Sequence, residues 1–119
     1  MKQLVFITSI DEQHILDNKG YENHILGYLI QTIEVLSLSL DMKVTLMFNT
    51  KHYKVLKQMQ FFKDLKKTLK LFNVKVKKLK KTKHTIFVAD DYTIQADIYH
   101  LMPLEHSIET LITQIQSRL

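Results

Sequence analysis

The lysine-rich segment from Lys51 to Lys83 is the part of the chain whose residue types most clearly imply a chemistry. It holds thirteen lysines and one carboxylate, Asp64, which gives the segment a net charge of +12. The rest of the chain has four cations against eleven carboxylates, so its net charge is −7 and the overall value is +5. Such an asymmetric charge attracts polyanions at long range, and binding of this kind weakens steeply as salt is added.

We take the lysines of this segment as the candidate binding residues, together with Tyr53, because Phe61, Phe62 and Phe72 are expected in the core. The candidates are Lys51, Lys54, Lys57, Lys63, Lys66, Lys67, Lys70, Lys75, Lys77, Lys78, Lys80, Lys81, Lys83 and Tyr53. Nucleic acid is the expected partner and an acidic protein is the alternative. The only arginine lies outside the segment, so binding should not depend on base sequence. Alternatively, these lysines are simply the solvated surface of a helix and an edge strand.

Three aspartates suggest a second, weaker chemistry. Asp11, Asp90 and Asp91 follow predicted strands, and carboxylate oxygens are ligands that magnesium prefers. A magnesium-dependent phosphate-transferring enzyme is therefore a weaker alternative, although aspartates at such positions usually form turns. We predict no catalytic residue, metal site or cofactor.

Several enzyme classes lack the residues that they need. The chain has no cysteine, which excludes disulfides, thiolate nucleophiles, sulfur carriage and cysteine-bound metals. Its six histidines show no HExxH spacing, and no phosphate-binding glycine loop or GxSxG motif is present. We therefore expect a protein without catalytic activity.

Hydrophobic periodicity predicts the elements that position these residues. Apolar runs predict strands at 2–8, 44–48 and 86–89, and alternation predicts an edge strand at 74–77. Apolar residues at three- and four-residue spacing predict helices at 21–40, over about 61–72, and from Pro103 to the end. We expect a loop over 9–20, and a turn with a short helix over 90–100.

The alternation of strands and helices predicts an α/β fold with a mainly parallel four-stranded sheet flanked by helices. A length of 119 residues suits a single domain, 1–119, and two glycines and one proline leave no linker-like stretch. No apolar stretch reaches the roughly 20 residues that span a bilayer. We expect a soluble cytoplasmic protein that does not insert into membranes.

The chain begins with a strand that ends in Thr-Ser, followed by a long apolar helix and the strand Lys43–Phe48, and Met102-Pro103-Leu104-Glu105 comes near its end. This order of elements resembles the small sulfur-relay subunits of the DsrE, DsrF and TusC type. The resemblance implies a small α/β fold that assembles into homo- or hetero-oligomers. The family's cysteine has no counterpart here, and Asn49-Thr50-Lys51-His52 replaces its glycine-rich turn. The second hypothesis is therefore a non-catalytic subunit of such an oligomeric complex.

Overall fold

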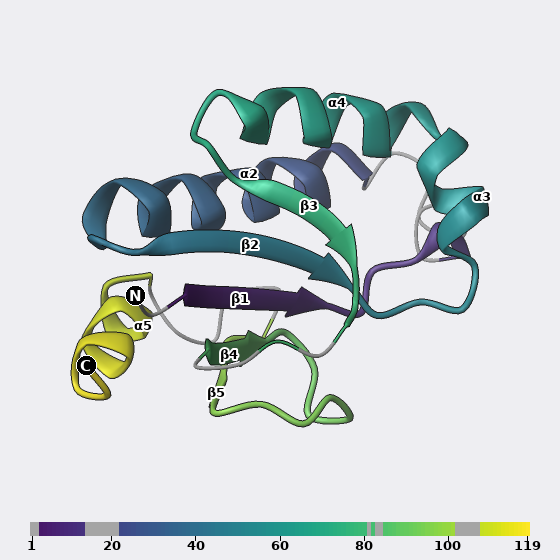
Figure 1. The fold of residues 1–119 in the computed structure, drawn as a ribbon. Helices are drawn as coiled ribbons and strands as arrows, with labels where there is room; N and C mark the ends of the chain where they lie inside the picture. Colours follow the sequence, from purple (N-terminus) through teal and green to yellow (C-terminus); the bar gives the residue numbers. More distant parts are fainter. Residues whose placement is uncertain (1–2, 14–21, 81, 83–84, 102–107) are drawn as a thin grey trace.

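The computed structural model describes residues 3–13, 22–80, 82, 85–101 and 108–119. Its strands are β1 (Gln3–Thr8), β2 (Lys43–Phe48), β3 (Lys75–Lys78), β4 (Thr85–Ala89) and β5 (Ile98–Tyr99). Its helices are α2 (Glu22–Ser39), α3 (Tyr53–Gln58), α4 (Gln60–Lys70) and α5 (Ile108–Gln116) (Figure 1). The predicted α/β fold is confirmed.

All five strands are parallel and form one sheet in the order β3-β2-β1-β4-β5. Strand β1 lies at the centre, where Gln3 is level with Lys43 of β2 and with Thr85 of β4. The chain builds outward from β1 to β3 and then returns to the other side of β1 for β4. The boundary between β1 and β4 is therefore the point at which the strand order reverses, which is where open α/β sheets commonly bind ligands.

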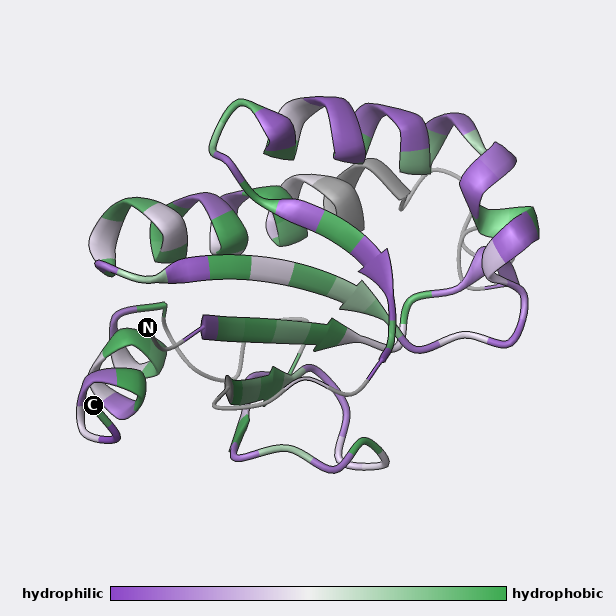
Figure 2. Cartoon of the chain, in the orientation of Figure 1, coloured by the Kyte–Doolittle hydropathy of each residue, from purple (hydrophilic) through white to green (hydrophobic). Residues whose placement is uncertain are grey.

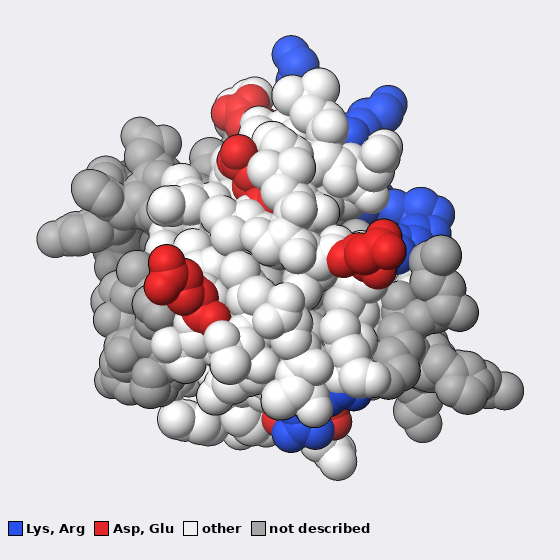
Figure 3. Space-filling model, turned by 90° about the vertical axis from the view of Figure 1, so that its left-hand side faces the viewer, with Lys and Arg blue, Asp and Glu red and all other residues white. Residues whose placement is uncertain are grey.

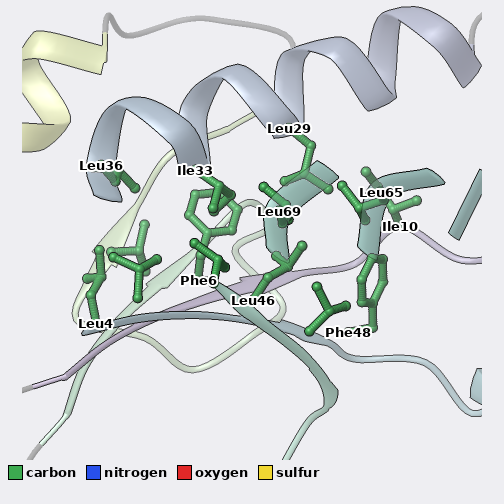
Figure 4. Close-up of a cluster of buried hydrophobic side chains, with 14 of the residues drawn as sticks. Leu4, Phe6, Ile10, Leu29, Ile33, Leu36, Leu46, Phe48, Leu65 and Leu69 are labelled. Atoms are coloured by element: carbon green, nitrogen blue, oxygen red, sulfur yellow. The ribbon is translucent and has the colours of Figure 1, made fainter. Parts of the chain in front are cut away.

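The first face of the sheet packs against the helices and carries the main core. In Figure 4, Leu29, Ile33 and Leu36 of α2 point toward side chains of the central strands and of α4. Leu4 and Phe6 of β1 are fully buried in this layer. Helix α5 joins the same core through its buried apolar side chains. No helix in the described part of the chain is long and apolar enough to cross a membrane.

The turn from α4 to β3 follows from local chemistry. The N–H of Val74 donates to the carbonyl of Leu69, and the N–H of Asn73 donates to that of Lys70, which is the Schellman pattern that ends a helix. Asn73 has a φ of 58°, in the left-handed region that asparagine tolerates better than most residues. The chain then enters β3, where hydrophilic and hydrophobic residues alternate (Figure 2).

The connection from β3 to β4 has only the six residues 79–84. The ladder places Lys78 level with the end of β1 and Thr85 level with its start. These positions are three strand spacings and five residue rises apart, about 22 Å, whereas seven steps of chain reach at most about 25 Å. The two described strand ends therefore lie close to the greatest distance that six joining residues can span.

The second face of the sheet lacks the helical cover of the first face in the described part of the chain. A right-handed connection that returns from β3 toward β4 must cross the face opposite α2 and α4. The segment 90–97, between β4 and β5, consists of turns and bends and lies on this same face, where Ile94 is buried. There it packs with a small cluster of strand residues, Val5, Ile7, Met47 and Ala89.

The structure corrects some expected elements. The sheet has five strands instead of four, because Ile98–Tyr99 pairs with β4 in the region predicted as a turn with a short helix. Helix α3 was not predicted, since only one of its residues, Leu56, is buried and no apolar stripe marks it. Glu12 and Gln13 are helical instead of looped. The predicted helix start at Pro103 and most of the predicted loop, 14–20, lie outside the described residues.

Replacing Leu46, which is fully buried in β2, by alanine should lower the free energy of unfolding by about 2–5 kcal/mol, because it leaves a cavity in the main core. The same change at Leu71, which is 81% exposed, should alter it by less than about 0.5 kcal/mol. Urea denaturation measures both values, and equal losses at the two positions would contradict this core.

Candidate functional site

The structure describes eleven of the thirteen lysines in the segment Lys51–Lys83, while Lys81 and Lys83 lie outside the described residues. Ten of the eleven are exposed and Lys77 is partly buried. In Figure 3, lysine and arginine side chains lie mainly along the upper and right-hand margins of the molecule. The eleven fall into two groups, one on the outer side of α3 and α4 and one at β3 and the residues that follow it.

The helical group lies opposite the apolar side of α4. Lys63, Lys66, Lys67 and Lys70 are exposed, whereas Phe61, Phe62, Leu65 and Leu69 are buried against the sheet. Lys51, Lys54 and Lys57 are exposed in and just before α3. The alternation of lysine and apolar residues in this part of the sequence thus separates a charged outer surface from the core.

Three of the four lysines in the second group lie on the second face of the sheet, whereas the register pairs Lys78 with Phe48, which belongs to the main core on the first face. The register pairs Lys75 with Thr45 and Lys77 with Met47, so both lysine side chains lie on the second face. Lys80 follows β3, and Lys43 begins β2 two residues before Thr45, on the same face. We call Lys43, Lys75, Lys77 and Lys80 the lysine cluster.

Three charges of the lysine cluster act on the fourth, that of Lys77. The pKa of Lys77 is lowered, first by the charge of Lys80, then by desolvation, and further by the charges of Lys75 and Lys43. Among the described residues, no carboxylate forms an ion pair with any of the four. The cluster is therefore an uncompensated concentration of positive charge, which an anionic ligand would relieve.

Lys43 was missed because it lies outside the lysine-rich segment in sequence. The alternation Lys43-Val44-Thr45-Leu46-Met47 places it on the same side of β2 as Thr45 and Met47. That alternation, combined with the strand order, was the signal that could have found it. The strand order, however, depends on pairing between distant segments.

Tyr53 lies between the helical lysines and the core. Its ring is 5.6 Å from that of Phe62, in an edge-on arrangement, and 6.5 Å from that of Phe48. The Lys57 ammonium is 5.8 Å from the centre of the Tyr53 ring. Burial raises the pKa of the Tyr53 phenol. Much of the ring predicted to contact a partner is therefore occupied in packing α3 against the sheet.

Asp90 joins the carboxyl ends of β1 and β4 at the point where the strand order reverses. Its carboxylate accepts hydrogen bonds from the Thr8 hydroxyl at 2.5 Å and from the Ser9 N–H at 2.8 Å. Burial raises the pKa of Asp90 above its ordinary value, although these two hydrogen bonds act in the opposite direction. Asp90 thus links the ends of β4 and β1 through buried hydrogen bonds.

The three aspartates considered for magnesium have different surroundings. Both oxygens of Asp90 accept hydrogen bonds, and Asp91 accepts from the N–H and hydroxyl of Thr93 in a local turn. Among the described residues, no group of three or more histidine, aspartate or glutamate side chains is placed to hold a metal ion. The described residues therefore give the magnesium hypothesis no support.

Two further polar pairs that sequence reasoning missed lie near this edge of the sheet. Tyr28 of α2 shares a hydrogen bond of 2.5 Å with Nε2 of His100, which is buried beside β4. Burial, above all, raises the pKa of the Tyr28 phenol, and the charge of Asp90 contributes. Glu12 pairs with the His52 imidazole, which ties the segment after β1 to the start of α3. These contacts hold helices to the carboxyl end of the sheet.

Replacing Asp90 by asparagine should change how stability depends on pH. Because its pKa is raised on folding, the folded chain retains a proton that the unfolded chain has lost above about pH 4, so Asp90 makes the free energy of unfolding fall as pH rises. The asparagine amide is uncharged and can keep both hydrogen bonds, because its oxygen can accept from Ser9 while its nitrogen donates to Thr8. Urea denaturation across pH 4–8 should show that the free energy of unfolding falls less with rising pH in Asp90→Asn than in the unmodified protein.

Asp64→Asn is the matched control for this experiment, because Asp64 is exposed and, within the described part of the chain, accepts a hydrogen bond from the neighbouring Gln60. It should keep the pH dependence of the unmodified protein. An unchanged pH dependence in Asp90→Asn would contradict the assigned burial of this carboxyl.

No protein-family model, curated protein or solved structure matches the chain. The likeness to sulfur-relay subunits accordingly stays a prediction.

Proposed function

We propose that this chain is a non-catalytic binding protein for polyanions, most of all nucleic acid, and that the lysine cluster is the centre of its binding surface. The observation that carries the proposal is the crowding of Lys43, Lys75, Lys77 and Lys80 on one face without a paired carboxylate among the described residues. The charges of Lys80, Lys75 and Lys43 all act on Lys77 strongly enough to lower its pKa. A phosphate backbone supplies the missing counter-charge.

The helical lysines extend this surface. Those of α3 and α4 lie on the other side of the edge strand β3, so the positive charge continues around the edge of the sheet. Long-range attraction by the whole segment increases the rate of encounter, while the lysine cluster makes the closest contacts. This division predicts that the two groups contribute unequally to affinity.

Lysine in place of arginine supports binding without base specificity. An ammonium is a compact, hydrated charge, whereas base reading commonly uses the planar, two-pronged guanidinium. The single arginine, Arg118, donates a hydrogen bond to the carbonyl of Asp97, near the C-terminal end of the chain. The surface therefore suits phosphates.

Replacing Lys75 and Lys77 by glutamine should weaken nucleic-acid binding. At about 50 mM salt, the affinity for a labelled oligonucleotide of about 20 nucleotides should fall by on the order of tenfold or more, because two phosphate contacts are lost. The slope of log affinity against log salt should decrease by about two. Fluorescence anisotropy over a salt series measures both quantities with RNA, single-stranded DNA and duplex DNA.

The double variant Lys66→Gln and Lys67→Gln is the matched control. It removes the same net charge from the exposed outer side of α4, so long-range attraction falls equally and only the location differs. Its loss of affinity should be clearly smaller. No binding by the unmodified protein at about 50 mM salt would overturn the proposed function, and equal losses in both variants would refute the central place of the lysine cluster.

A second candidate function is docking in an oligomeric complex, as the resemblance to sulfur-relay subunits implies. The observation in its favour is that the described residues place no helix on the second face of the sheet, whereas parallel sheets usually carry helices on both faces. Native mass spectrometry of the protein from its own host should then show an oligomer or a bound partner chain. A strictly monomeric, partner-free species would argue against it.

A further inference from the structure

The second face of the sheet carries an open hollow of about 630 Å³ beside the lysine cluster. Ile7 of β1 and Phe87 of β4 form its floor, and Leu79 and Lys80 line it together with the segment 93–97. Asn49, at the end of β2, completes the lining. The volume falls within the range of roughly 300–1,000 Å³ in which proteins hold small ligands.

The wall formed by segment 93–97 is fixed by hydrogen bonds. Phe87 and Asp97 exchange two bonds of 2.9 Å, from the Asp97 N–H to the Phe87 carbonyl and from the Phe87 N–H to the Asp97 carboxylate. The Tyr99 hydroxyl donates to the Ile94 carbonyl at 2.7 Å and accepts from the Ala96 N–H at 3.2 Å. The hollow is thus part of the folded structure, and the one carboxylate in its lining is engaged with backbone.

The chemistry of the lining suits a flat, polar-edged ring. Phe87 is only partly buried, so part of its ring is open to a ligand that packs on it. The amides of Asn49 and Gln95 can donate and accept hydrogen bonds at the rim, and the hydroxyl of Thr93, which donates to Asp91, can accept one. Aromatic side chains stack on nucleobases without regard to sequence, since every base has a π-face.

The hollow and the lysine cluster are joined by one residue. Lys80 lines the hollow and is also the neighbour whose charge most strongly lowers the pKa of Lys77. A chain with phosphates along the lysine cluster would therefore carry a base to the hollow. An acidic protein would supply negative charge but no nucleobase. In a duplex, the bases are stacked inside the double helix and are not free to enter the hollow.

We infer that the ligand is single-stranded nucleic acid, with its backbone on the lysine cluster and one base in the hollow against Phe87. This inference rests on the proposed function and narrows it. Single-strand binders combine the same two features, a positively charged track for the backbone and an aromatic platform for bases.

The experiment compares three ligands of similar charge by fluorescence anisotropy at about 50 mM salt. They are an oligothymidylate of about 20 nucleotides, an abasic strand of the same length, and a duplex of about 10 base pairs, which carries about the same number of phosphates. The oligothymidylate should bind about tenfold more tightly than the abasic strand, as expected for stacking of about one base. Phe87→Leu should remove most of that preference while leaving the affinity for the abasic strand unchanged.

Phe72→Leu is the matched control, because Phe72 is also partly buried but packs against the main core under the helices. It should keep the preference for bases. Circular dichroism and urea denaturation establish that both variants are folded. Ultraviolet crosslinking of the unmodified protein adds a measurement without mutation, and mass spectrometry should locate crosslinked thymine at Phe87 or in segment 93–97.

The outcomes separate this inference from the proposed function. Equal affinity for the thymidylate, abasic and duplex ligands would refute the inference that a base binds in the hollow, but it would still agree with polyanion binding. Crosslinks only on α3 or α4 would overturn it as well. Absence of binding to every ligand would refute both, and preferential binding of an acidic polypeptide over all three would replace nucleic acid by a protein partner.

Discussion

The structure depends on the shortness of the connection between β3 and β4. Six residues must return the chain across β2 and β1, a distance of about 22 Å, which is close to the most that they can span. The helices α2 and α4 cover the first face, as the right-handed rule requires for the connections from β1 to β2 and from β2 to β3. One face consequently carries the main core, and the other keeps only a small apolar cluster, an open hollow and exposed lysines among the described residues.

The difference in packing between the two faces of the sheet determines on which face lysines can lie. On the first face, alternate residues of the central strands pack against apolar helix residues, so a lysine buried there would be costly, and Lys78, at the end of the edge strand β3, is exposed. On the second face, the same alternation leaves Lys75 and Lys77 beside Lys43 and Lys80, where water or a ligand must solvate them. Asp90 meanwhile ties β1 to β4 from within. The larger apolar core thus lies on one side of the sheet, and the proposed binding surface lies on the other.

The sequence predicted the local features well and the long-range ones poorly. The buried side of α4, with Phe62, Leu65 and Leu69, followed from periodicity within one element, and the α/β class and the parallel sheet followed from the alternation of strands and helices along the chain. Strand β5 could not be predicted, because two residues show no pattern and their pairing is set by β4. Lys43 and the hollow were missed because both arise from strand order, which no local window contains.

The central claim is that the second face of the sheet, with its lysine cluster, receives a single strand of nucleic acid. Nuclear magnetic resonance of the isotope-labelled protein during titration with a single-stranded oligonucleotide tests it most directly. Chemical-shift changes should concentrate at Lys75, Lys77, Lys80 and Phe87 and stay small on the outer side of α4. Changes confined to α3 and α4, or no change at low salt, would contradict it.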